Sequence, residues 1–168
     1  MKVIDNFLLK DYYKELKELV HSNKFGWFYH SGTTPHPEDK NYMFTHNLYR
    51  DNRINSDFYN KFEPLKYFIS SHIPFNQLLR IKVNLYPNQG KQIKHRPHHD
   101  QEDKNNIPEK NIHIGIFNFT TCNGSTVIGD KKIASKENQI VFFENTIEHY
   151  GITQSDTDTR IVLNIVFK

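Results

Sequence analysis

Cysteine is almost absent from this sequence of 168 residues, and Cys122 is the single one. No intrachain disulfide and no zinc site built on several cysteines can therefore form. Long apolar runs are absent as well, because none approaches the roughly 18 residues that a membrane-spanning helix needs. Asp5 lies where the apolar part of a signal peptide would have to be, so we expect a protein of the reducing cytoplasm with no membrane partner.

Charge of one sign is also scarce, since 22 Lys and Arg residues stand against 19 Asp and Glu residues and the net charge is +3. Proteins that bind nucleic acid usually carry a dense stripe of Lys and Arg, whereas these charges are spread evenly along the chain. A nucleic-acid partner is therefore not expected. Ten histidines are many for this length, and together with carboxylates they could bind a metal without sulfur.

Aromatic residues are abundant, with 13 Phe and 9 Tyr, and such side chains favour half-buried strands. From Leu79 onward the apolar residues recur at every second position, which predicts β-strands. One face of segment 80–86 is apolar, and the other carries Arg80, Lys82, Asn84 and Tyr86. Further strands are expected within 111–119, 124–129, 138–143 and 160–167. Several short strands joined by turns are typical of an antiparallel sandwich or barrel.

The first 78 residues have a different pattern. Helical spacing predicts a helix over about 10–22 and a second over about 55–71, which Pro64 interrupts. Residues 24–31 are strand-like. The mixed segment 40–53 is interpreted as a surface loop that covers the barrel, with contact to a substrate as the alternative. We expect one domain, with residues 1–78 as a helical N-terminal support and residues 79–168 as the β-core.

His98 and Asp100 are the first candidates for chemistry, because side chains two apart in an extended segment project to the same side. His149 follows a later strand and could supply a third ligand. Two histidines and one carboxylate on one face of an octahedron are the ligand set of non-haem Fe(II) oxygenases. A His-x-Asp triplet is common by chance, so the pattern alone leaves a fortuitous pair open.

Arg160 adds a fourth element at the start of the apolar strand RIVLNIVF. A buried guanidinium is costly unless it meets an anion, and a carboxylate is its natural bidentate partner. An ordinary salt bridge at the end of a sheet is the alternative for this residue.

The order of these four residues on a background of strands resembles the 2-oxoglutarate and Fe(II)-dependent oxygenases. The prolyl-hydroxylase-like branch is more similar still, because there too a strand ending in Tyr-Pro, here Tyr86-Pro87, precedes the His-x-Asp motif. The segment IFNFT, with Asn118 in place of a Tyr, and the segment Gly124-Ser125-Thr126 follow the same branch. RIKVNLYP and TQSDTDTRIVLN resemble a subgroup found in phages and marine bacteria. The resemblance covers about residues 79–168.

The fold that this resemblance implies is mainly β (α+β), a double-stranded β-helix or jelly roll with N-terminal supporting helices. The implied Fe(II) ligands are His98, Asp100 and His149. Arg160 would bind the distal carboxylate of 2-oxoglutarate, and Tyr86 would donate a hydrogen bond to the same molecule. The implied cofactors are Fe(II), 2-oxoglutarate as cosubstrate and O2, with ascorbate as a further candidate.

Three asparagines are weaker candidates for contact with 2-oxoglutarate. Asn118 takes the position of a tyrosine that contacts this molecule in the family, although an amide reaches less far than a phenol. Asn84 and Asn164 share strand faces with Tyr86 and Arg160 by alternation. For these two, a buried structural hydrogen bond is at least an equal alternative.

The implied activity is that of a dioxygenase that hydroxylates a C–H bond and releases succinate and CO2. Its substrate would be a small molecule, an amino acid or a peptide, and a phage-encoded chain would work in the host cytoplasm. The alternatives are a cupin-like metal-binding jelly roll without oxidative activity and a nucleobase demethylase of the same superfamily. A simple cupin has no need for Arg160, and a demethylase would need a basic, aromatic-lined groove.

The polar segment 101–110 follows Asp100 directly and is expected to be a mobile loop beside the metal. A lid over the substrate and a plain solvated turn are both open interpretations of it. His113 is expected to pack within its strand rather than to react.

Overall fold

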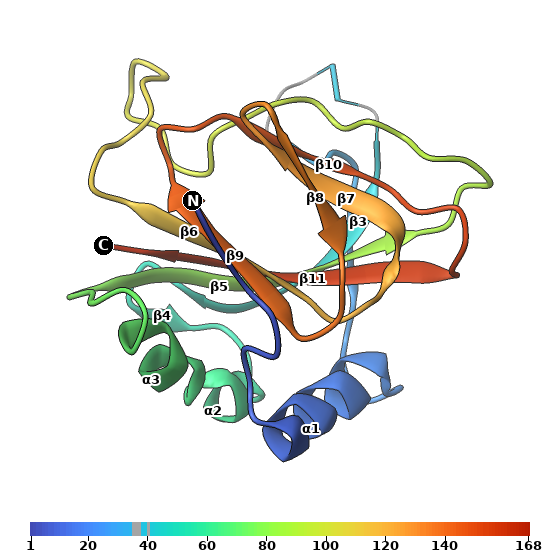
Figure 1. Cartoon of the computed structure of the whole chain (residues 1–168), viewed down its shortest axis with the longest axis horizontal. Helices are drawn as coiled ribbons and strands as arrows, with labels where there is room; N and C mark the ends of the chain where they lie inside the picture. Colours follow the sequence, from blue (N-terminus) through green and yellow to red (C-terminus); the bar gives the residue numbers. More distant parts are fainter. Residues whose placement is uncertain (35–37, 40) are drawn as a thin grey trace.

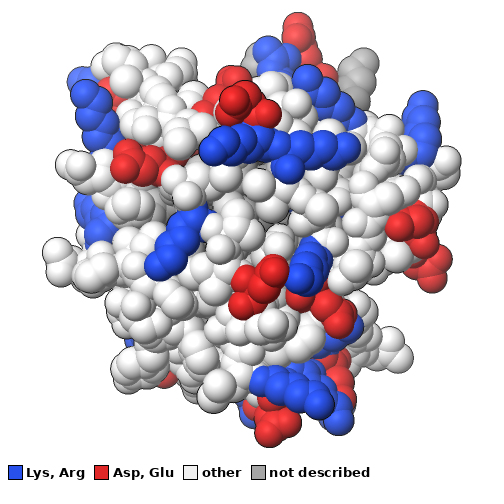
Figure 2. Space-filling model, viewed as in Figure 1, with Lys and Arg blue, Asp and Glu red and all other residues white. Residues whose placement is uncertain are grey.

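The computed structural model describes residues 1–34, 38–39 and 41–168 and contains two facing β-sheets, with helices on the outer side of the larger sheet (Figure 1). The expected jelly roll is thereby confirmed. None of the described helices is long and apolar enough to cross a membrane. On the face shown in Figure 2, Lys and Arg side chains lie among Asp and Glu side chains rather than in a stripe of one sign.

The large sheet is antiparallel throughout, and its two longest strands lie at its centre. In spatial order its strands are β1 (Lys2–Ile4), β9 (Gln139–Glu144), β6 (His113–Asn118), β11 (Thr159–Phe167), β5 (Leu78–Pro87), β3 (Met43–Arg50) and β2 (Phe28–His30), with β4 (Arg53–Ile54) paired to β3. Strands β5 and β11 are paired along nearly their whole length. Polar side chains on these two strands are therefore held in a fixed register.

The small sheet comprises β10 (His149–Ile152), β7 (Cys122–Ile128) and β8 (Lys131–Ser135). The segment from Ile93 to His98 runs antiparallel to β10 and extends this sheet. The His95 amide donates to the Gly151 carbonyl at 2.9 Å, and the His98 amide donates to the His149 carbonyl at 3.0 Å. The small sheet thus carries candidate site residues opposite the large one.

Alternation along the central strands gives the large sheet two buried faces. The outer face packs against α1 (Lys10–His21), α2 (Tyr59–Phe62) and α3 (Leu65–Ser70) and forms an apolar core. Ile81 and Val83 of β5 and Leu163 of β11 lie in this core and are completely buried. Arg80, Lys82, Asn84 and Tyr86 face the small sheet, as the period of two predicts.

The single helix expected over 55–71 is instead two short helices. Helix α2 ends at Phe62, and α3 begins after Pro64, whose φ is −58°. Proline has no backbone N–H and clashes with the preceding turn, so it suits a helix start but not a helix interior. Pro64 thus divides the expected helix in two, although Glu63 and Pro64 both keep helical backbone angles.

The interpretation of 40–53 as a surface loop is wrong for its described residues, because Met43–Arg50 forms β3 beside β5. Residues 1–78 therefore contribute strands to the large sheet as well as helices. The register shifts between Asn47 and Tyr49, and Leu48 is the extra residue of this β-bulge. The bulge breaks the alternation of apolar and polar residues by which a strand is recognised in sequence.

Phe117 of β6 should be a major contributor to the outer core. It is fully buried, and its ring lies 5.0 Å from that of Phe119 and 6.2 Å from that of Phe7. We expect Phe117→Ala to lower the free energy of unfolding by about 3–5 kcal/mol in urea denaturation. Tyr67→Ala removes an exposed ring of α3 and should change the free energy of unfolding by less than about 0.5 kcal/mol. Equal losses would contradict this assignment of the core.

Candidate metal centre and its cavity

A cavity of about 270 Å³ lies between the two sheets. The large sheet supplies a floor of polar side chains from β3, β5 and β11, and the small sheet and segment 93–100 supply the opposite wall. The lining includes Arg50, Arg80, Lys82, Asn84, Tyr86, His95, His98, Asp100, Thr126, His149, Arg160 and Asn164. Residues far apart in the sequence thus line one cavity.

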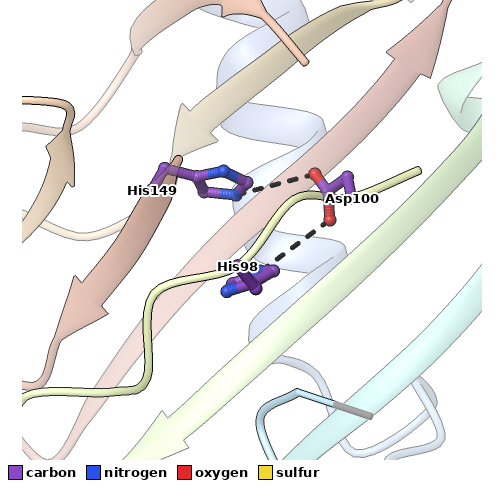
Figure 3. A group of neighbouring side chains, drawn as sticks. All are labelled: His98, Asp100 and His149. Atoms are coloured by element: carbon purple, nitrogen blue, oxygen red, sulfur yellow. Dashed lines mark ion pairs between the residues drawn. The ribbon is translucent and has the colours of Figure 1, made fainter. Parts of the chain in front are cut away.

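The structure brings His98, Asp100 and His149 together at the wall of this cavity (Figure 3). One potential ligand atom of each lies within 4.8 Å of the others. The Asp100 carboxylate is 4.0 Å from Nε2 of His98 and 3.7 Å from Nε2 of His149. Two backbone hydrogen bonds between His98 and His149 fix the spacing of the two imidazoles.

Asp100 is held by two side chains of the central strands. Nη2 of Arg80 donates to Oδ1 at 2.6 Å, and Nδ2 of Asn164 donates to Oδ2 at 2.7 Å. Arg80 also donates to Oδ1 of Asn164, which locks the three side chains together. Burial opposes the ionisation of Asp100, but Arg80, the two histidines and Asn164 outweigh it and lower its pKa. Asp100 therefore stays a carboxylate, the form that binds metal.

The two histidines are suited to metal binding in their neutral form. Burial lowers the pKa of His149 to about 4, so it remains uncharged near neutral pH. Nδ1 of His98 lies 3.2 Å from the Arg96 carbonyl oxygen, and a hydrogen bond there leaves Nε2 with a free lone pair toward Asp100. Two neutral imidazoles and a carboxylate fit a ferrous ion better than calcium, which prefers oxygen ligands alone.

Asn145 positions the backbone of Asp100, although no sequence motif pointed to this residue. Its Oδ1 accepts from the amides of Asp100 at 3.1 Å and Gln101 at 3.0 Å. Its Nδ2 donates to the carbonyls of Gln101 and Glu109, at 2.7 and 3.0 Å. Asn145 thereby ties both ends of segment 101–110 together. This segment folds back on itself, and none of its residues lines the cavity, so a lid here stays a prediction.

Arg160 lies at the other end of the cavity and is only 1% exposed. Nη2 donates to Oγ1 of Thr126 at 2.9 Å, and Nε donates to Oγ of Ser135 at 3.3 Å. No carboxylate of the described chain lies within ion-pair distance of Arg160. The alternative interpretation, a salt bridge at the end of the sheet, therefore has no support among these residues. Burial lowers the pKa of this guanidinium. Burial of a cation without an ion-pair partner costs free energy, and an anionic ligand would offset this cost.

Two glycines make room for this guanidinium between the sheets. A Cβ atom at Gly124 would lie 2.9 Å from Cδ of Arg160 and 3.0 Å from the Ile152 carbonyl oxygen. A Cβ atom at Gly151 would lie 3.1 Å from Nδ1 of His95. The small sheet can approach Arg160 only because these two positions carry no side chain.

The other predicted contacts fall into two groups. Tyr86 and Asn84 line the cavity near Arg160, and Oδ1 of Asn84 is buried without a hydrogen-bond partner in the described part of the chain. Asn164 also lines the cavity but holds Asp100. Asn118 is not among the lining residues, and its Oδ1 lies 3.1 Å from the Ser135 hydroxyl that contacts Arg160. Asn118 thus reaches Arg160 only through Ser135.

The cavity also contains residues that were not among the predicted site residues. His95 packs against the Tyr86 ring at 5.1 Å, and burial lowers its pKa to about 4. Lys82 and Arg50 line the cavity on the side of β3, and burial together with Arg80 lowers the pKa of Lys82 to about 7. The polar face of segment 80–86 was the available signal for Lys82. The bulge in β3 interrupts the alternation along this strand, so the sequence pattern did not place Arg50 on the cavity side.

Two further histidines have structural partners. Nδ1 of His99 lies 3.4 Å from a Glu102 carboxylate oxygen, outside the cluster of three. His113 stacks on Phe167 with ring centroids 5.6 Å apart, which confirms that it is packed.

Comparison with solved structures identifies the fold. A 2OG-Fe(II) oxygenase family oxidoreductase from Burkholderia pseudomallei superposes with a TM-score of 0.74 at 9% identity, over 98% of this chain and 84% of that one. A prolyl hydroxylase from Trichoplax adhaerens, in complex with a hypoxia inducible factor peptide, gives 0.67 at 12% identity, over 99% and 82%. A Pseudomonas putida prolyl-4-hydroxylase gives 0.63 at 13% identity, over 99% and 91%. No family model and no curated protein matches the sequence.

Asp100→Asn should abolish measurable Fe(II) binding in an anaerobic titration, because it removes the one anionic ligand of the cluster while it keeps the shape of the side chain. His99→Gln is the matched control, since His99 is adjacent in sequence but outside the cluster. It should bind Fe(II) as the unaltered protein does. Full iron stoichiometry in Asp100→Asn would rule out Asp100 as a ligand.

The metal-free protein should lose stability as the pH falls from 7 to 5. His149 and His95 have pKa values of about 4 when folded, against an ordinary value of 6.5, so the unfolded chain binds more protons in this range. The loss should be about 2 kcal/mol for each histidine. His95→Gln should remove about half of it, whereas His21→Gln, on the exposed side of α1, should not change it. An unchanged pH dependence in His95→Gln would refute the account.

Proposed function

The fold is that of the 2OG-Fe(II) oxygenases, and from this premise we propose that the chain is a 2-oxoglutarate- and Fe(II)-dependent dioxygenase. The proposal treats residues 1–168 as one oxygenase domain, because both sheets contribute to a single cavity. The absence of disulfide-forming cysteine pairs supports a location in the cytoplasm.

A single observation carries the proposal: one cavity has a His-Asp-His cluster at one end and, at the other, a buried arginine with no ion-pair partner among the described residues. On β11, Asn164 contacts the cluster and Arg160 lies four residues away, a spacing of about 13 Å along a strand. Side chains at both ends shorten the gap that a ligand must bridge. A short dicarboxylic acid with a 2-oxo group fits these two ends, since it could chelate the metal and pair with Arg160.

The residues present fit both groups. His98, Asp100 and His149 would hold Fe(II), and Arg160 would hold the distal carboxylate, with Thr126 beside it. Tyr86 would donate its hydroxyl to the same carboxylate, and the free Oδ1 of Asn84 would face the bound molecule or a water. When bound, iron and 2-oxoglutarate supply the oxidising power through reaction with O2 and release of succinate and CO2. Ascorbate would serve only to keep the iron reduced.

The reaction that we propose is hydroxylation of a C–H bond in a peptidyl or amino-acid-like substrate. The similarity to prolyl hydroxylases, one of them bound to a peptide, supports this substrate class. The protein would hold the reacting groups in place and exclude water, so that the oxidant meets the substrate rather than solvent. A cupin-like protein without oxidative activity would not need the buried charge of Arg160.

The direct test is absorption spectroscopy of the protein with Fe(II) and 2-oxoglutarate under anaerobic conditions. A weak visible charge-transfer band is expected only when both ligands are bound to one metal. On admission of O2, slow formation of succinate should follow even without a primary substrate. A protein that binds Fe(II) but gives neither band nor succinate would be a metal-binding jelly roll of another kind.

Arg160→Ala should raise the half-saturating concentration of 2-oxoglutarate by a factor of tens or more while Fe(II) binding persists. Truncation of one partner of a desolvated charge pair typically costs about 2–5 kcal/mol. Arg160→Lys should restore part of the affinity, because a point charge cannot reproduce the bidentate fork. Arg53→Ala, on the exposed strand β4, is the control. Equal loss of iron and 2-oxoglutarate binding would mark Arg160 as structural.

A further inference from the structure

We infer that Lys82 and Arg50 form a second anion-binding subsite beside the metal, which takes the carboxylate of a free amino acid as the primary substrate. The inference rests on the proposed function and narrows its substrate class. It starts from the side of the cavity that faces β3, which neither the metal ligands nor Arg160 occupy.

Strand register places the two cations next to the metal centre. Lys82 lies on β5 opposite Asn164 of β11, whose amide holds Asp100. Arg50 of β3 lies opposite Arg80 of β5, which is the other partner of Asp100. Lys82 is two residues from Arg80, about 7 Å along the strand. A small acid bound at Lys82 would thus place its carbon atoms close to the metal.

The bulge in β3 is what gives Arg50 this position. With regular alternation from Asn47, which lies opposite Lys82, residue 50 would point to the helix side of the sheet. The extra residue Leu48 restores Arg50 to the cavity side, opposite Arg80. Bulges commonly serve to redirect a side chain beside a functional site.

The charges of the cavity remain unbalanced after metal and cosubstrate are counted. Asp100 is the only acidic residue among those described as lining the cavity, against four basic side chains: Arg50, Arg80, Lys82 and Arg160. Asp100 pairs with Arg80, and 2-oxoglutarate would pair with Arg160 and the metal. Arg50 has an exposed pair with Asp51 at 3.3 Å, at the rim. Lys82 has no ion-pair partner within the described ranges, so a carboxylate on the substrate would supply one.

The kind of acid follows from the class of substrate proposed above. A free amino acid carries an α-carboxylate that Lys82 and Arg50, both of which line the cavity, would bind. A residue within a peptide chain has this carboxyl group in an amide bond. A carboxylate subsite beside the metal therefore favours a free amino acid over a peptidyl residue.

The test uses the full chain loaded with Fe(II) and 2-oxoglutarate under anaerobic conditions. Common free L-amino acids are titrated one at a time, and the readout is a shift of the visible band. Each is compared with its C-terminal amide, which keeps the ammonium but lacks the carboxylate. The N-acetyl amides of aspartate and glutamate represent a carboxylate carried by a peptide. We expect at least one free amino acid to shift the band and its amide to bind about tenfold more weakly or worse.

The variants are Lys82→Met and Arg50→Met, with Lys82→Arg as the conservative replacement. Either Met variant should weaken binding of the responsive amino acid about tenfold or more, and Lys82→Arg should recover part of it. The 2-oxoglutarate concentration that half-saturates the anaerobic band should change less than about threefold. Lys131→Met, on the exposed strand β8, should match the unaltered protein in both titrations.

Several results would overturn the inference. The first is that no free amino acid shifts the band. The second is that the acid and its amide bind equally, or that the N-acetyl amides bind best. The third is that Lys82→Met loses 2-oxoglutarate binding, which would assign Lys82 to the cosubstrate. In each of these cases the band itself still forms in the unaltered protein, so the proposed function stands. Failure of the band in the unaltered protein would remove the proposed function and this inference with it.

Discussion

The negative charge of Asp100, kept in a cavity shielded from water, is the constraint on which the rest of the site depends. A lone carboxylate there would take up a proton, and a protonated acid is a poor metal ligand. Arg80 and Asn164 prevent this by direct hydrogen bonds from β5 and β11. Because these strands are neighbours in the large sheet, the sheet register and the geometry of the candidate metal site are set by the same backbone hydrogen bonds.

The division of the large sheet into two faces allows so polar a cavity to exist. The outer face packs its apolar side chains against the three helices, and this core supplies most of the buried hydrophobic surface. The inner face can then carry a row of charged residues whose burial costs stability. One strand such as β5 serves both purposes, with Ile81 and Val83 on one side and Arg80 and Lys82 on the other.

Much of the fold could be predicted from sequence because β5 alternates apolar and polar residues over 80–86 and β11 is a short apolar run, as is typical of a buried strand. The cluster of His98, Asp100 and His149 could also be expected, since the identity of its residues matches a known ligand set. Strand β3 could not, because the bulge at Leu48 breaks the pattern that identifies a strand. Asn145 was also beyond reach, since it acts through backbone amides that lie far from it in the sequence. Residues whose role depends on long-range geometry leave no local signal.

The place of β11 in the sheet has a consequence for how the chain folds. Strand β11 follows all the other strands in the sequence, yet it lies between β5 and β6 and joins them. Until it has been synthesised, β5 and β6 share no neighbour, and each keeps an open edge that can pair with other chains. Pairings over such long sequence separations also slow folding. The nascent protein therefore passes through a stage that is prone to aggregation, and this stage ends only when the strand that carries Arg160 and Asn164 docks.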